Sequence, residues 1–241
     1  LEREFGLSLI VTPPSVEFKI VRNNNEEVIV RNPSKLDEFT DIKNIEERIC
    51  ELDLLFPKEY LGSIMKLLNE KRGVQLDLVY LSTSMVKAKY TIPLLELVSG
   101  FYDSLKSISQ GFASLDYKIL DFKKGNLVKL DILVNGLVID SFSSILSKEN
   151  SEFIGRSRVK KLSQLIPRQQ FDIPIQAAIG SRIIARETIK ALRKDVTAKL
   201  YGGDVTRKRK LLEKQKEGKK KMRSIGKVEV PKEAFKEFLK E

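Results

Sequence analysis

The sequence predicts an α+β fold built from two successive domains, and three observations lead to this prediction. Apolar and polar residues alternate in several short runs, which is the pattern of half-buried strands. Between these runs, apolar residues recur at helical spacing after prolines that suit the first turn of a helix. The apolar content of 41% suffices for buried cores, and 241 residues leave room for about two domains of ordinary size.

The first part of the chain is predicted to be the end of a domain that begins upstream. Residues 1–31 contain two β-rich runs separated by a pair of prolines and followed by a turn at Asn23–Asn25. Residues 32–48 mix proline, serine and acidic groups with little periodicity, and we expect them to be a linker. Because the chain begins with Leu1 rather than Met, we expect a piece of a longer protein.

From residue 49 the elements follow in the order strand, helix, strand, strand, helix, strand over about seventy residues. This order is that of the ferredoxin-like βαββαβ fold, so residues 49–123 are predicted to be one domain. Gly73 is expected to stop the first helix in a left-handed conformation. Strands are predicted at 50–56, 74–80, 86–92 and 115–119, and helices at 57–73 and 93–105.

Residues 124–241 are predicted to form a second, mixed α/β domain with a long basic helix. Asn135-Gly136 is the dipeptide typical of a two-residue hairpin turn. Pro174 interrupts an apolar run, which therefore lies at a sheet edge or carries a bulge. In chain order we expect the hairpin strands 127–134 and 137–146, a helix from Asn150 to Pro167, a strand at 171–179, a helix over 183–192, the basic helix 205–223, an extended piece 225–230 and a last helix after Pro231.

The net charge of +11 is concentrated in the last third of the chain. Residues 1–154 carry 19 basic and 23 acidic side chains, whereas residues 155–241 carry 25 basic and 10 acidic ones. Such an asymmetry indicates a polyanionic partner, and nucleic acid before a membrane surface. Residues 207–223 hold ten basic, two acidic and only three apolar residues, too few for a core-facing stripe. A solvated charged helix is the alternative interpretation.

The candidate RNA-binding residues are the basic side chains of this last third together with one tyrosine. Phosphate contact and shape recognition are expected to dominate, because the only aromatic residues between Arg156 and Arg223 are Tyr201 and Phe171. The candidates are Arg156, Arg158, Lys160, Lys161, Arg168, Arg182, Arg186, Arg193, Lys194, Lys199, Tyr201, Arg207, Lys208, Arg209, Lys210, Lys214, Lys216, Lys219, Lys220, Lys221 and Arg223.

Nothing in the sequence indicates a catalytic, metal or cofactor site in this chain. There is no histidine, which excludes His-based triads and His-assisted metal sites. The single cysteine, Cys50, falls on a predicted buried strand face, where it acts as a small apolar residue, and it suits a reducing compartment. Phosphate-loop, dinucleotide-binding and nucleophile-elbow patterns do not occur, and no apolar run reaches membrane-spanning length.

Several motifs resemble the LepA (elongation factor four) family of translational GTPases, and the resemblance extends over the whole chain. The earlier motifs are shared with elongation factor G, as its domain V, whereas the later ones are specific to the C-terminal domain of LepA. The first residues resemble the end of domain III. The motifs are Pro57–Gly62 with Glu70–Gly73, and then Leu165–Ile173, Gln176–Gly180, Ala198–Asp204 and Arg207–Lys220.

This resemblance implies a function for the chain and for the protein to which it belongs. LepA-type proteins bind the ribosome, contact large-subunit rRNA at the factor-binding site and A-site tRNA, and hydrolyse GTP with magnesium in an N-terminal domain. Back-translocation, rescue of stalled ribosomes and help in subunit assembly have all been assigned to them. In domain V, the resemblance and a predicted outward basic loop make Lys71, Arg72 and Gly73 candidates for rRNA contact.

The same resemblance sets expectations for partners and location. We expect a monomer that binds no DNA, uses no cofactor within this chain and acts in the cytoplasm. Peripheral association with the inner membrane, or an organelle matrix in a eukaryote, is also compatible with the family. The alternatives are a stand-alone RNA-binding ribosome-assembly factor without GTPase activity and an enzyme of another class; nucleotide binding by this chain would favour the enzyme.

Overall fold

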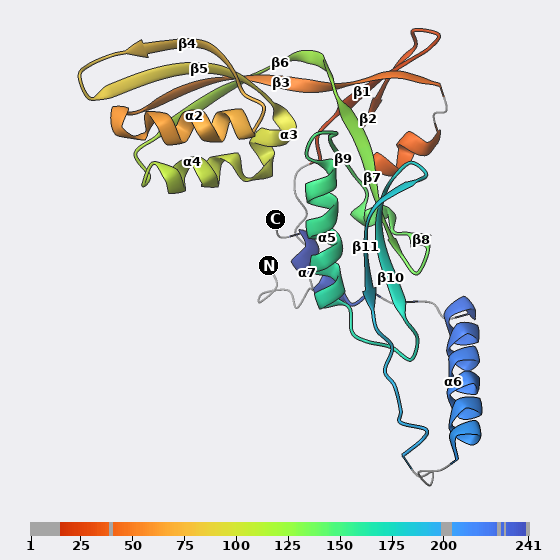
Figure 1. Cartoon of the computed structure of the whole chain (residues 1–241). Coiled ribbons are helices and arrows are strands. Elements are labelled where there is room, and N and C mark those ends of the chain that lie inside the picture. Colours follow the sequence, from red (N-terminus) through yellow and green to blue (C-terminus); the bar gives the residue numbers. More distant parts are fainter. Residues whose placement is uncertain (1–14, 39–40, 199–203, 226–227, 229, 240–241) are drawn as a thin grey trace, which may run out of the picture. The chain divides into compact units, whose positions relative to one another are not determined.

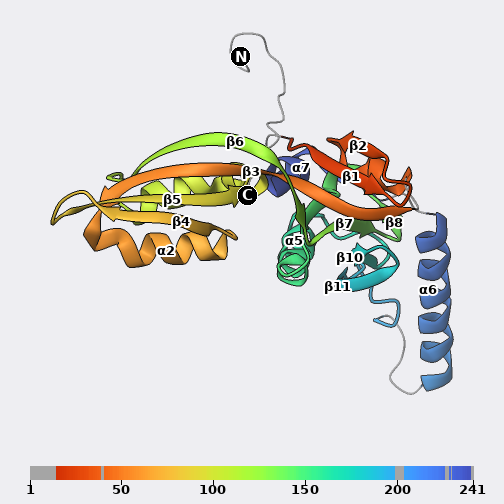
Figure 2. The same cartoon turned by 90° about the horizontal axis from the view of Figure 1, so that it is seen from above.

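The computed structural model describes residues 15–38, 41–198, 204–225, 228 and 230–239. These residues form two compact units, of which the first ends at Leu127 and the second begins at Val128. Each combines antiparallel strands with helices (Figures 1 and 2), which confirms the predicted α+β class. Residues 1–14 of the expected domain remnant lie outside the described residues.

The first unit is a six-stranded antiparallel sheet organised around one long strand, β3 (Ile42–Pro57). Along one side of β3 lie β1 (Phe18–Arg22) and then β5 (Met85–Pro93), and along the other side lies β6 (Ser114–Gly125). The outer neighbours are β2 (Glu27–Val30), which pairs with β1, and β4 (Val74–Tyr80), which pairs with β5. The strand order β6-β3-β5-β4 therefore accounts for the four strands predicted between 49 and 123.

Two helices cover one face of this sheet (Figure 1), and the apolar core lies between helices and strands. Helix α2 (Leu61–Glu70) buries Ile64 and Leu68 against the alternating apolar residues of β3, which point inward as predicted. The second predicted helix is interrupted: α3 (Leu94–Glu96) and α4 (Tyr102–Ile108) are separated by a kinked turn. The kink falls at Gly100, whose φ of +72° is accessible to glycine without steric cost.

The prediction that residues 32–48 form a linker is wrong over most of their length. Pro33–Glu38 is a 3-10 helix, and β3 begins at Ile42, so that β1, β2 and the later strands belong to one sheet. The sequence shows no apolar alternation at the start of β3, because ion pairs between neighbouring strands stabilise this part in place of apolar contacts. The Lys19 ammonium, for example, lies 3.0 Å from the Glu46 carboxylate on the neighbouring strand.

The second unit contains a five-stranded sheet with helices packed on it. The strand order is β11-β10-β7-β8, and β9 also pairs with β7. Helices α5 (Ser151–Leu165) and α7 (Lys232–Leu239) complete the core, in which the rings of Phe142 and Phe238 lie 4.2 Å apart between centroids. The strands are β7 (Leu127–Val134), β8 (Leu137–Val138), β9 (Ser144–Ser147), β10 (Ile173–Ile179) and β11 (Arg182–Ile189).

Two predictions for the second unit need correction, and a third, which left two alternatives open, is decided by the structure. The helix expected over 183–192 is strand β11, because a turn at Gly180 reverses the chain and a segment rich in β-branched residues then pairs with β10. The hairpin turn at Asn135-Gly136 is confirmed, but its second strand ends at Val138 instead of continuing to 146. Of the two alternatives predicted for the run interrupted by Pro174, the bulge is confirmed, at Ala177/Ala178, and the edge position is wrong, because β10 lies between β11 and β7.

Candidate nucleic-acid interface

Helix α6 (Val205–Ile225) carries the densest positive charge of the chain. Its first turn is capped by Asp204, whose Oδ1 accepts a hydrogen bond from the backbone N–H of Arg207 at 3.0 Å. Gly218 lowers helix propensity, but it is surrounded by lysine, glutamate, glutamine and leucine, which favour helix. The described helix therefore covers the whole basic run 207–223.

Polar contacts to the main chain fasten α6 to its own unit. The Gln215 side-chain amide donates to the backbone carbonyl of Lys194 at 2.9 Å, and the Lys219 ammonium donates to that of Leu192 at 2.7 Å. Near the helix end, the Asn135 amide donates to the carbonyl of Arg223 at 3.2 Å. The helix thus runs beside the segment that follows β11 (Figure 1), and its apolar side chains contribute little: Leu212 remains 52% exposed.

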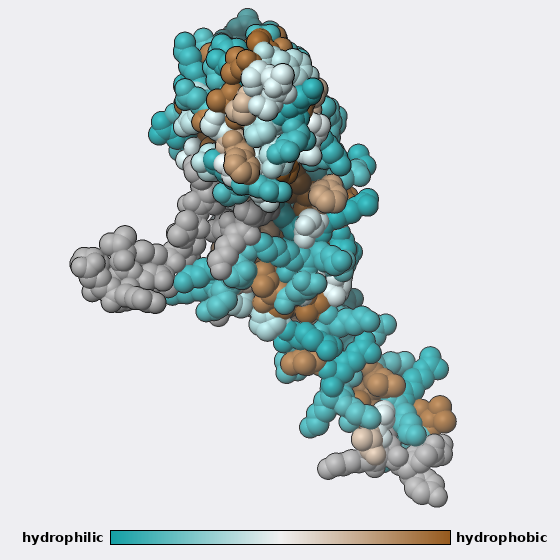
Figure 3. Space-filling view, turned by 90° about the vertical axis from the view of Figure 1, so that its left-hand side faces the viewer, coloured by the Kyte–Doolittle hydropathy of each residue, from teal (hydrophilic) through white to brown (hydrophobic). Residues whose placement is uncertain are grey.

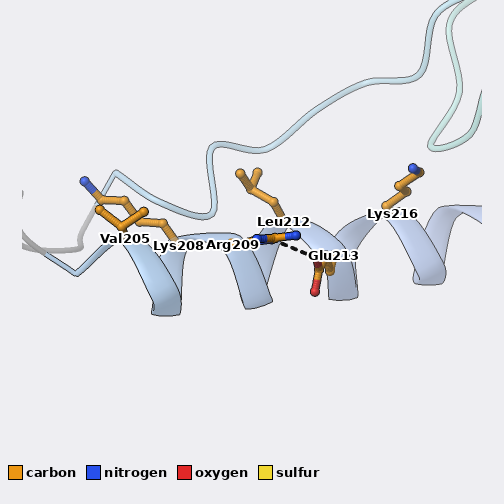
Figure 4. A pocket seen from close by; sticks show the side chains of 6 residues that line it. All are labelled: Val205, Lys208, Arg209, Leu212, Glu213 and Lys216. Atoms are coloured by element: carbon orange, nitrogen blue, oxygen red, sulfur yellow. Dashed lines mark hydrogen bonds and ion pairs between the residues drawn. The ribbon is translucent and has the colours of Figure 1, made fainter.

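The remaining circumference of α6 presents two exposed basic ridges, as the helical rotation of about 100° per residue requires. Glu213 and Glu217 lie between the ridges, and Glu213 pairs with Arg209 at 3.3 Å (Figure 4). Lys208 and Lys219 are partly covered on the face toward the segment after β11. The first ridge consists of Arg207, Lys210, Lys214 and Lys221, and the second of Arg209, Lys216, Lys220 and Arg223.

Exposed basic residues also lie on α5, on β11 and on the segment after it. The guanidinium groups of Arg156 and Arg182 flank the carboxylate of Glu152, at 3.8 and 3.7 Å. Two cations thus share one anion, so this surface keeps a net positive charge. The other exposed candidates here are Lys160, Arg186, Arg193 and Lys194. On the face of the molecule shown in Figure 3, hydrophilic residues predominate among the described ones.

Two predicted candidates instead hold the second unit together. Arg168 donates from Nε to the carbonyl of Lys190 at 2.9 Å and from Nη2 to that of Ala191 at 3.2 Å. The Arg158 guanidinium donates to the Ser144 hydroxyl and lies over the ring of Phe238. Both arginines join separate segments, as planar donors with several N–H groups can. Lys161 is half-buried.

The basic turn Lys71–Gly73 of the first unit does not present the outward loop that the sequence predicted. Arg72 makes a bidentate pair with the 3% exposed Glu47, at 2.6 and 3.0 Å, and its Nε donates to Glu96 at 3.0 Å. Burial opposes the charged form, but the bonds and charge of Glu47 prevail and raise the pKa of Arg72. Lys71 donates to the carbonyl of Ser99 at 3.2 Å.

The left-handed residue of this turn is Arg72, with φ of +59°, and not Gly73. Glycine is nevertheless required at the next position, because a Cβ on Gly73 would lie 2.8 Å from the backbone oxygen of Leu68. The backbone N–H of Gly73 donates to that same oxygen at 2.7 Å and closes the helix end. The turn is therefore built for close packing, with the arginine directed at two carboxylates.

The aromatic candidates also change. Lys199 and Tyr201 lie outside the described residues, and Phe171 is buried in the core of the second unit, where it cannot stack on a base. Sequence reasoning missed Phe153, which is 78% exposed on α5. Helical periodicity could have identified it, because Leu162 follows Phe153 by nine residues, and a rotation of about 100° per residue puts the two on opposite faces of the helix.

Cys50 is fully buried, and burial raises the pKa of its thiol. No group of three or more potential metal ligands occurs in the described part of the chain. Among the same residues, no helix is both long and apolar enough to cross a membrane.

Comparison with known proteins divides the chain in nearly the same way as its structure. Residues 134–240 match the family described as GTP-binding protein LepA C-terminus, and residues 44–133 match that described as Elongation factor G C-terminus. Proteins named Elongation factor 4 from Leptospira biflexa, Clostridium tetani and Acetivibrio thermocellus are 53%, 52% and 51% identical over 240 residues. These matches cover 100% of this chain and 40% of each relative.

Proposed function

Because the chain belongs along its whole length to the LepA family of elongation factor 4 proteins, we propose that it is the ribosome-binding C-terminal part of a translational GTPase. The observation that carries the proposal is the pair of exposed basic ridges on α6, a helix with too little apolar surface to serve a protein core. Basic ridges of this kind contact phosphates, whose spacing is independent of base sequence.

In this proposal the two units have different tasks. Within the first unit, residues 49–123, with strand order β6-β3-β5-β4 and helices on one face, are the ferredoxin-like domain V that lies against large-subunit rRNA at the factor-binding site. The second unit places α6 and the exposed arginines of α5 and β11 against rRNA and A-site tRNA. Arg72 is not assigned to RNA contact, because its Nε, Nη1 and Nη2 atoms each donate a hydrogen bond to Glu96 or Glu47.

The whole protein is proposed to act in translation elongation, as a cytoplasmic monomer that binds no DNA. Repositioning of tRNA, through back-translocation or rescue of stalled ribosomes, fits a helix such as α6, whose basic ridges contact the phosphate backbone of RNA and not its base sequence. The alternative is a stand-alone assembly factor without GTPase activity; the whole-length similarity to elongation factor 4 argues against it. GTP and magnesium would be held by parts of the protein outside these residues.

We expect this chain to bind ribosomes without hydrolysing GTP. We predict that it pellets with isolated large ribosomal subunits but adds no phosphate release when GTP is supplied. The reason is that the sequence contains no phosphate-loop pattern to cradle the nucleotide phosphates. Pelleting and phosphate release are measured in one mixture, against ribosomes alone. Phosphate release above that background would contradict the assignment of GTP hydrolysis to other parts of the protein.

A further inference from the structure

Phe153 has an exposure that the core of its unit does not explain. Its side chain is 78% exposed, the largest value among the exposed large hydrophobic residues of the described chain. The same helix buries Val159 and Leu162 completely on its other face, so α5 does not need Phe153 for packing. Leaving an aromatic ring in water forgoes the stabilisation that burial would provide, about 25 cal/mol per Å² of apolar surface.

The backbone that presents this ring is firmly placed. Gly155, two residues further, is buried where α5 crosses β10 and β11. A Cβ at Gly155 would lie 3.3 Å from the Ala177 methyl and 2.9 Å from the end of Ile184. The helix therefore sits close against the sheet at this point, and Phe153 projects from a fixed support rather than from a loop.

The surroundings of Phe153 are cationic. Arg156 and Lys160 follow at positions i+3 and i+7, which places all three exposed side chains on one face of α5. Arg182 reaches the same end of the helix, because it lies 3.7 Å from Glu152, the residue before Phe153. With one carboxylate among three cations, the patch retains positive charge around an exposed aromatic face.

We propose that Phe153 is a stacking platform for an unpaired base of RNA, with Arg156, Lys160 and Arg182 binding the flanking phosphates. Single-stranded nucleic acid is bound by this combination of aromatic ring and cationic rim. The charge of the rim favours a polyanion over an apolar protein surface as occupant. The inference rests on the proposed function and deepens it, since it adds a contact to bases where α6 offers contact to phosphates.

The absence of tryptophan from this chain gives a direct test. In the Phe153→Trp variant, indole fluorescence should be quenched by oligoadenylate but not by polyphosphate, which has charge without bases. Phe112→Trp is the matched control, because Phe112 is also exposed but belongs to the first unit and not to the second unit, which carries the positive excess. Equal quenching by both polyanions, or none in the Phe153→Trp variant, would overturn the stacking assignment.

A second variant measures the contribution of the ring. Phe153→Ala should weaken oligoadenylate binding about 10-fold, the usual effect of losing one stacked base, without changing the salt slope or the melting temperature. Oligoadenylate affinity that survives Phe153→Ala overturns the inference but leaves the proposed function standing. If Phe153→Ala reduces only ribosome binding, the ring contacts a protein instead. No RNA binding by the unaltered chain would refute the proposed function itself.

Discussion

Replacing Arg72 with methionine is expected to lower the free energy of unfolding of the first unit by about 3–5 kcal/mol, the usual effect of leaving a buried charge unpaired. Arg72 joins the end of α2 to β3 through Glu47 and to α3 through Glu96. The Glu47 carboxylate is only 3% exposed, so water cannot replace the lost guanidinium. Chemical denaturation, followed by circular dichroism, measures the loss.

Two controls separate charge from packing at this site. Lys71→Ala, at the neighbouring position, should lower the free energy of unfolding by less than about 1 kcal/mol. The Lys71 ammonium lies 3.7 Å from the Glu96 carboxylate and remains partly exposed, so its pairing contributes little. The double variant Glu47→Gln, Arg72→Met should lose less free energy of unfolding than Arg72→Met alone, since the buried carboxylate of Glu47 is then absent as well. If Arg72→Met unfolds at the same denaturant concentration as the unaltered chain, the pairing is not a structural requirement.

Exchange of the first ridge of α6 for glutamine is expected to reduce affinity for ribosomes on the order of 100-fold at physiological salt. The four residues changed are Arg207, Lys210, Lys214 and Lys221. If each neutralises one phosphate, the slope of log affinity against log salt should become less steep by about 3. The helix should persist, because glutamine is also a good helix former.

The matched control removes four exposed lysines from the first unit, Lys66, Lys118, Lys123 and Lys124. This variant has the same net charge as the ridge variant, so any difference between them reports position rather than total charge. Because the first unit is also proposed to lie against rRNA, we expect a loss here too, but a clearly smaller loss of affinity and of salt slope than in the ridge variant. Equal losses in both variants would show that net charge, and not the ridge, determines binding.

Sequence reasoning predicted the elements best where burial on one face of a sheet or helix leaves a periodic trace. The alternation from Cys50 to Phe56 placed the C-terminal half of β3 correctly, and Asn135-Gly136 placed the hairpin turn. The start of β3 was not predicted, because ion pairs such as Lys19–Glu46 stabilise it in place of apolar contacts. Strand β11 escaped because its apolar residues lack strict alternation and its register depends on pairing with β10.

The candidate site was predictable as a charge distribution but not residue by residue. Composition located the positive excess, yet it could not show that Arg168 donates to backbone carbonyls, whereas Arg182, also exposed, lies beside the Glu152 carboxylate. That distinction depends on which segments the fold brings together. The partners of Arg72 are likewise far away in sequence, so its structural role emerges only when α2, β3 and α3 are packed.

The dependence of ribosome affinity on salt tests the central claim most directly, namely that this chain binds RNA through phosphate contacts of its second unit. Affinity for purified ribosomes would be measured across a series of salt concentrations. If about six phosphates are neutralised, log affinity should fall with log salt at a slope of roughly −4 to −5. A flat response would contradict the claim, because it would leave the 25 basic residues of 155–241 as solvated surface charge.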